Sequence, residues 1–131
     1  MPSEPLPSPA RRAALRRRLL AWWDAGHRDL PWRVPQHGAD PYRVWLADFR
    51  AIATMPGIGW AMTFQDPSTG WLSNHFVTLH ENGVPVGFRP ILVLDGWEHA
   101  FMRDYKAFER AKYVEAFFKN VDWAAVEARL K

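Results

Sequence analysis

The sequence predicts an α+β fold, because two helical patterns come first, three strand-like runs follow, and helical patterns return at the end. Apolar residues recur at helical spacing within residues 9–25 and 40–56. Aromatic and β-branched residues then dominate three short runs between residues 58 and 95. We find no internal repeat, and the strands are expected to form a small sheet with helices packed against it.

The first two helices are expected to begin with the same capping pattern. Ser8-Pro9 and Asp40-Pro41 each place a capping side chain before a proline at the first helical position. Gly26 is expected to end the first helix, and Pro56-Gly57 the second. The Pro and Gly content of residues 27–39 predicts a loop between them.

The middle of the sequence is expected to form a hairpin and a third strand. The runs 58–65 and 71–79 flank Asp66-Pro-Ser-Thr-Gly70, which has the composition of a turn. A loop over residues 80–89 then leads to a strand over residues 90–95.

The C-terminal part is expected to be helical. Residues 98–107 are predicted as one helical segment and 110–120 as a second, with Tyr113, Val114 and Phe117 on the apolar side of the second. Asp122 is predicted to cap a short last helix over residues 123–130.

Composition excludes several classes of protein. The sequence has 131 residues and no Cys, which removes disulfides, thiolate metal ligands and Cys nucleophiles. No run of 18 apolar residues is present, so no membrane span is expected. Residues 1–9 lack the apolar core of a signal peptide, and we therefore expect a cytoplasmic location.

Positive charge is concentrated in the first 50 residues, which carry nine Lys and Arg against five Asp and Glu. Arg11, Arg12 and residues 16–18 supply most of it. A basic helix can bind phosphate backbones, so nucleic acid is one candidate partner. A solvated helix face gives the same pattern, and the sequence leaves both interpretations open.

The strongest chemical signal is an acid and an imidazole that follow the third strand. Asp95 ends the apolar run 90–94, and His99 follows four residues later, at the predicted start of a helix. Carboxylate and imidazole are common ligands of first-row transition metals. Two ligands do not complete a metal site, so the function depends on what else is near them.

Residues from about 47 to 131 resemble the C-terminal domain of iron/manganese superoxide dismutases. The resemblance implies a three-stranded antiparallel sheet packed against helices. The segments that carry it, in the order and spacing of that family, are Asp48-Phe-Arg-Ala-Ile, Gly57-Ile-Gly-Trp60, Asp66-Pro, Arg89-Pro-Ile-Leu-Val-Leu-Asp95, Trp97-Glu-His-Ala100, Tyr105 and Tyr113-Val-Glu-Ala-Phe-Phe-Lys-Asn-Val-Asp-Trp123.

This resemblance implies a role for each matching residue. Asp95 and His99 correspond to two metal ligands of the family, so Fe or Mn is the implied cofactor. Trp60 and Trp97 correspond to aromatic walls of the metal pocket, and His80 to an outer group that hydrogen-bonds metal-bound solvent. Such outer groups orient the ligands and tune the metal.

The same resemblance implies a homodimer and an incomplete centre. Glu98 corresponds to a residue that reaches the ligand His of the other subunit, which makes Glu98 and His99 the expected dimer contacts. The two further His ligands of the family come from an N-terminal domain that is not recognisable here, so metal binding is expected to be weak or absent. His27, His37 and His75 are interpreted as surface or hydrogen-bonded histidines rather than as replacements.

Residues from about 11 to 48 resemble the start of A/G-specific adenine DNA glycosylases. The segments are Leu19-Leu-Ala-Trp-Trp-Asp24, Arg28-Asp-Leu-Pro-Trp-Arg33 and Asp40-Pro-Tyr-Arg-Val-Trp-Leu-Ala-Asp48. By this resemblance, a vestigial pocket for a flipped base would use Arg28, Leu30, Trp32 and Arg33. Asp48 stands where that family has a catalytic Glu, one methylene shorter, which puts its reach as a general acid in doubt.

Together the two resemblances suggest a chimera, with a glycosylase-like helical segment at 1–46 and a dismutase-like domain at 47–131. The two parts are expected to fold as one cooperative unit. Leu15, Leu19, Trp22 and Trp23 of the first helix would then cover the pocket side of the dismutase-like domain.

Three functions remain open from the sequence. The first is a dismutase-derived metal-binding domain with weak or absent dismutase activity. The second is a catalytically inactive structural or interaction protein. The third is a nucleic-acid-binding protein that uses the basic N-terminus.

Overall fold

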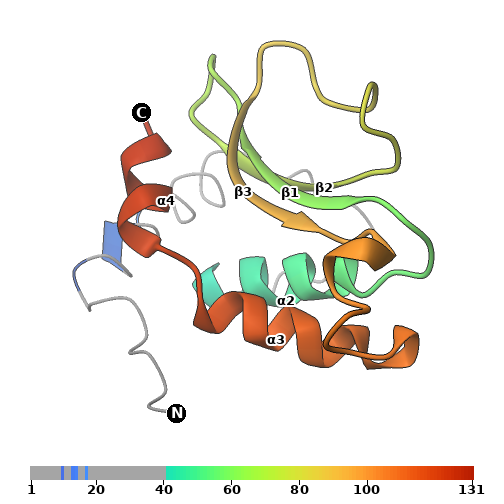
Figure 1. Ribbon diagram of the computed structural model, residues 1–131. Coiled ribbons are helices and arrows are strands. Elements are labelled where there is room, and N and C mark those ends of the chain that lie inside the picture. The colour runs from blue at the N-terminus through green and yellow to red at the C-terminus, as the bar shows by residue number, and fades with distance from the viewer. Residues whose placement is uncertain (1–9, 11–12, 15–16, 18–40) are drawn as a thin grey trace, which may run out of the picture.

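The computed structural model describes residues 10, 13–14, 17 and 41–131 (Figure 1). The expected first helix, apart from those four positions, and the expected loop 27–39 lie outside the described residues. The described elements are α2 (Pro41–Ala53), β1 (Trp60–Gln65), β2 (Leu72–Val77), β3 (Arg89–Asp95), the 3₁₀ turns η1 (Glu98–Ala100) and η2 (Ala107–Glu109), α3 (Arg110–Lys119) and α4 (Trp123–Arg129).

The three strands form one antiparallel sheet in the order β2-β1-β3, which confirms the predicted α+β class. β1 lies in the centre, where Trp60 pairs with Val77 on one side and with Asp95 on the other. A register shift between Thr63 and Phe64 interrupts the pairing with β3. This pairing brings the end of β3 beside the start of β1, and so sets Asp95 next to Trp60.

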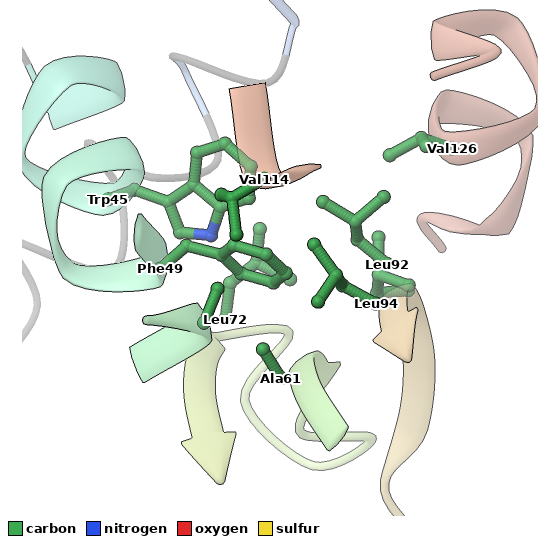
Figure 2. Packing of buried hydrophobic residues seen from close by; sticks show 10 residues of the cluster. Trp45, Phe49, Ala61, Leu72, Leu92, Leu94, Val114 and Val126 are labelled. Atoms are coloured by element: carbon green, nitrogen blue, oxygen red, sulfur yellow. The ribbon is translucent and has the colours of Figure 1, made fainter. Parts of the chain in front are cut away.

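Helices cover one face of the sheet (Figure 1). α2 and α3 run side by side below it, joined by the Arg50–Glu115 ion pair at 2.9 Å. The rings of Phe49 and Phe117 stack between the two helices with their centroids 6.5 Å apart. Among the described residues, the main cluster of buried hydrophobic side chains consists of Trp45, Phe49, Ala53, Ala61, Leu72, Ile91, Leu92, Leu94, Val114 and Val126 (Figure 2).

A series of hydrogen bonds links α2 to the middle of the sheet. The Trp45 indole donates to Thr63 Oγ1 at 3.1 Å, and Thr63 donates to Asn74 Oδ1 at 2.6 Å. The Asn74 amide in turn donates to the Trp45 carbonyl and to Asp48 Oδ2, at 3.2 and 2.9 Å. The network satisfies the polar groups of Thr63, which is buried, and fixes the position of α2 on the sheet.

The turn and the last helix follow the sequence predictions. Asp66 Oδ1 accepts hydrogen bonds from the backbone and the hydroxyl of Ser68, as expected for the turn after β1. Asp122 caps α4 by accepting from the backbone amides of Ala124 and Ala125. None of the helices in the described part of the protein has the length and apolar character that crossing a membrane requires.

The predicted single helix over residues 98–107 is wrong. Only Glu98–Ala100 forms a 3₁₀ turn, residues 101–105 form turns and a bend, and Ala107–Glu109 forms a second 3₁₀ turn before α3. Phe101 is buried and stacks on Tyr113 at 5.1 Å, which anchors the irregular segment against α3. Packing of this one ring outweighs the helical preference of its neighbours.

Candidate metal centre

The two candidate metal ligands lie on a turn that leaves the end of β3. Gly96 donates its backbone N–H to the Gly59 carbonyl at 2.8 Å, which ties the turn to the residue before β1. Asp95 Oδ1 accepts from the Trp97 backbone N–H at 2.9 Å. The Asp95 side chain therefore closes its own turn with one oxygen and leaves the other oxygen to face His99.

Asp95 and His99 are brought together as the sequence predicts. Asp95 Oδ2 and His99 Nε2 are 3.2 Å apart, and the His99 and Asp95 side chains are 66% and 25% exposed. A carboxylate oxygen and an imidazole nitrogen at the molecular surface form a donor pair that suits iron or manganese. Their exposure leaves room for further ligands from outside the described residues or from solvent.

Three aromatic side chains stand beside this pair. The Trp60 indole donates to His80 Nδ1 at 3.0 Å, so a neutral His80 carries its proton on Nε2. His80 stacks on Trp97 at 4.4 Å, and Trp97 is near-parallel to His99 at 6.2 Å. The structure thus groups all three residues that the sequence assigned to the outer shell with the two candidate ligands.

Two residues that carry no site signal in the sequence support the backbone of the site. The Tyr113 hydroxyl donates to the Asp95 carbonyl at 2.9 Å, and Arg110 Nη1 donates to the Gly57 carbonyl at 2.5 Å. Burial, and secondarily the charge of Asp95, raises the pKa of Tyr113, which keeps its proton for this bond. Tyr113 belongs to a segment that carries the dismutase resemblance, but nothing in the sequence marked its contact with Asp95, and no sequence signal marked Arg110.

Asp95 and His99 are the two side chains near each other here that could act as metal ligands. Across residues 41–131 and the four isolated positions, no group of three or more His, Asp or Glu side chains could hold a metal ion together. Asp95 and His99 therefore form a two-ligand arrangement among the described residues. The Trp97 indole N–H beside them is buried and has no hydrogen-bond partner there.

The other predicted site residues lie apart from this pair or outside the described region. Glu98 is exposed on the turn η1, and its role as a dimer contact stays a prediction. Asp48 is exposed on α2, where its carboxylate accepts the hydrogen bond from Asn74 rather than one from the cluster around Asp95. Arg28, Leu30, Trp32 and Arg33, the expected base pocket, lie outside the described residues, as do His27 and His37.

His75 lies on β2 and takes part neither in the cluster around Asp95 nor in the hydrogen bond between Asn74 and Asp48. Its Nε2 is 2.7 Å from Ser73 Oγ, and its ring packs edge-on against Phe64 at 5.3 Å. Burial lowers the pKa of His75 below its ordinary value of 6.5. The fold therefore favours the neutral ring.

This pKa shift predicts a pH dependence of stability. The unfolded state binds the His75 proton more readily than the folded one, so the contribution of His75 is fully present above pH 6.5 and is lost as the pH falls toward the lowered pKa of the folded state. Urea unfolding between about pH 8 and 5 should show a steeper loss of stability in the wild type than in His75→Gln. Equal slopes for the two proteins would remove His75 as the cause.

Comparison with known proteins finds relatives that match most of the described part of the protein. The family model described as iron/manganese superoxide dismutases, C-terminal domain, matches residues 40–129. A superoxide dismutase [Mn] 2 of Haloferax volcanii is 41% identical over 88 residues, covering 67% of this chain and 43% of the relative. A superoxide dismutase [Mn/Fe] of Aeropyrum pernix is 41% identical over 81 residues, and a superoxide dismutase [Fe] of Mycobacterium tuberculosis is 39% identical over 84.

These matches cover most of this chain but only part of each relative. The Aeropyrum and Mycobacterium alignments cover 62% and 63% of this chain, but 37% and 40% of the relatives. The aligned region thus spans less than half the length of each of these three relatives. The family match begins at residue 40, inside the segment that resembles glycosylases, and these comparisons lend that second resemblance no support.

Proposed function

Since the chain belongs to the iron/manganese superoxide dismutase family through its C-terminal domain, we propose that Asp95 and His99 hold iron or manganese as part of a dismutase-type centre. The observation that carries the proposal is the 3.2 Å approach of Asp95 Oδ2 to His99 Nε2 beside three aromatic side chains. When bound, the metal supplies one-electron redox chemistry that oxidises and reduces superoxide in turn. Relatives named for manganese, for iron and for both support this choice of metals.

The described residues would orient Asp95 and His99 but would not supply the remaining metal ligands. Trp97 N–H and Tyr113 O–H hold the side chain and the carbonyl of Asp95, so the carboxylate is oriented before a metal arrives. Trp60 fixes the tautomer of His80, and the stacked Trp97 and His80 rings form an aromatic wall beside the pair. With two ligands from this part of the protein, we expect weak metal binding and weak or absent dismutase activity.

A homodimer is part of the same proposal. Glu98 and His99 are adjacent, exposed residues on η1, and an acid at such a position can reach a histidine of a second copy. Light scattering of the wild type and of Glu98→Gln would show whether this acid supports association.

The role of the first 46 residues also remains a proposal. The apolar residues Leu15, Leu19, Trp22 and Trp23 would cover the domain, and the Arg-rich surface of the same segment would be its solvated face. The glycosylase-like assignment of this segment stays a prediction. The hydrogen bond from Asn74 to Asp48 favours a structural role for that acid over general acid chemistry.

Metal titration of the full-length protein tests the central proposal. Wild-type protein should bind Mn²⁺ or Fe²⁺ at one site, and Asp95→Ala or His99→Ala should weaken binding by about 10–100-fold or more, since each removes one of two ligands. Asp104→Ala, which deletes an exposed acid on the same segment, is the matched control and should bind like the wild type. Calorimetry gives the affinities, and elemental analysis after purification gives the native occupancy.

Two results would separate this proposal from an inactive structural protein. If Asp95→Ala and His99→Ala bind metal as the wild type does, the two residues are not ligands. If the wild type and all variants are folded but none of them takes up either metal above trace, the result favours a structural or interaction protein. A dismutase assay on the metal-loaded wild type then measures whether any redox cycling accompanies binding.

A further inference from the structure

The loop that joins β2 to β3 contains an asparagine followed directly by a glycine. Asn82 and Gly83 are both exposed, and the backbone at Asn82 is a bend outside any helix or strand. Among the described residues, neither the Asn82 amide nor the Gly83 N–H makes a hydrogen bond. A primary amide and a backbone nitrogen thus lie next to each other, and no hydrogen bond within the described part of the protein restrains either one.

We propose that Asn82 is a site of self-modification, at which the protein converts this asparagine to aspartate and isoaspartate. The Gly83 nitrogen loses its proton to a solvent base and attacks Cγ of Asn82, and a new C–N bond closes a five-membered imide. The bond between Cγ and Nδ2 of Asn82 breaks and ammonia leaves. Water then opens the imide at either carbonyl, so one water is consumed, one ammonia is released, and no oxidant or reductant is required.

The residue after the asparagine decides whether the nitrogen can approach. Gly83 has no Cβ to crowd the attack on Cγ, and a glycine backbone moves easily through the conformations that ring closure needs. The loop lies at the surface and its backbone amides are not used in the sheet, so the movement breaks no structural hydrogen bond.

The two other asparagines of the sequence provide internal comparisons. Asn74 lies on β2 with its amide donating to Trp45 and to Asp48, and His75 follows it. Asn120 ends α3 with its amide donating to the Ala116 carbonyl, and the β-branched Val121 follows it. Both amides are held, and both following residues carry a side chain that hinders attack.

Conversion at Asn82 would change the charge and the backbone close in sequence to His80. It replaces a neutral amide by a carboxylate, which lowers the formal net charge of +3 by one. The isoaspartate product also lengthens the backbone by one methylene. Both changes fall two residues after His80, the side chain that accepts the Trp60 hydrogen bond and stacks on Trp97.

Peptide mapping by mass spectrometry tests the proposal on the full-length protein. Wild type is incubated in mildly alkaline buffer made with ¹⁸O-water, beside Asn82→Gln and a synthetic peptide with the sequence of residues 79–85. Asn82 should lose its amide on the order of tenfold faster than Asn74 and Asn120, which corresponds to a barrier lower by about 1.4 kcal/mol. The products should be both aspartate and isoaspartate, each with one solvent oxygen.

Charge-sensitive chromatography provides a second readout. The wild type should accumulate an acidic form over time, and Asn82→Gln should not, because its longer side chain would have to close a larger ring. An intact Asn82 in protein whose matching peptide reacts would overturn the proposal, as would equal rates at all three asparagines. Formation of aspartate without isoaspartate would also overturn it, since direct hydrolysis bypasses the imide.

Discussion

Gly96→Ala is expected to destabilise the domain by about 3 kcal/mol, because the added Cβ has no space. An ideal Cβ at Gly96 would overlap Arg110 Nη2 and lie 2.7 Å from the Gly59 carbonyl oxygen. That oxygen also accepts the Gly96 N–H, so the clash falls on the hydrogen bond that joins the turn carrying Asp95 and His99 to the residue before β1. Urea unfolding measures the loss of stability, and metal titration shows whether the altered turn also binds metal more weakly than the wild type does.

Two variants make the interpretation of Gly96→Ala specific. Gly87→Ala introduces the same methyl group where nothing lies within 4 Å, at a φ of +77°, so it should cost only about 1–2 kcal/mol of backbone strain. Adding Arg110→Ala to Gly96→Ala removes the side-chain overlap but not the one with the Gly59 carbonyl, so it should not restore stability. A Gly96→Ala protein as stable as Gly87→Ala would show that the turn adapts.

Phe49→Ala is expected to cost about 3–5 kcal/mol, which is a large part of the stability of a domain of this size. The Phe49 ring is fully buried between α2, α3 and the sheet (Figure 2). It contacts Trp45, Phe117 and Phe118, with ring centroids 5.6 to 6.5 Å apart. Truncation leaves a cavity that three aromatic side chains line and that rigid rings fill poorly.

Phe49→Leu is the matched control, because it keeps an apolar side chain at the same position while leaving a smaller void. We expect it to be clearly more stable than Phe49→Ala and less stable than the wild type. Thermal and urea unfolding of the three proteins give the order. An order in which Phe49→Ala equals the wild type would contradict the assignment of Phe49 to the centre of the core.

Local signals in the sequence are enough to predict most of the described elements. The Asp66 turn, the Asp122 cap and the aromatic and β-branched composition of the strands each depend on residues close together in the sequence. Elements that depend on distant partners could not be predicted in this way. The 98–107 segment has helical spacing, but burial of Phe101 against Tyr113 breaks it into 3₁₀ turns.

The same division applies to the candidate site. Asp95 and His99 are four residues apart, so their spacing pointed to a shared site, and the structure sets them side by side. Tyr113 is 18 residues from Asp95, whose carbonyl it binds, and Arg110 is 53 residues from Gly57, whose carbonyl it binds. Only the fold shows these contacts. Outside the site, Gln65 also has a distant partner that the sequence does not indicate. Its side-chain amide donates to and accepts from the backbone of Lys131, 66 residues away.

The family match also shows that a short helical segment is not enough to assign part of the sequence to a family. Residues 40–46 resemble a glycosylase segment, but the dismutase family match includes them, and 41–46 continue without a break through α2. Amphipathic helices with Trp, Leu and acidic residues look alike in unrelated families, because burial on one face imposes a common pattern. Such a helix is therefore weak evidence for a relationship to either the dismutases or the glycosylases.

Paramagnetic broadening by Mn²⁺ in the NMR spectrum of the full-length protein tests the central claim most directly. Substoichiometric Mn²⁺ should first broaden the backbone amide signals of the turn from Asp95 to Ala100, and then those of Trp60 and His80 beside it. His99→Ala should remove this selectivity. Broadening spread evenly over surface acids such as Asp66, Asp104 and Glu109, with no preference for the turn, would contradict the assignment of Asp95 and His99 as metal ligands.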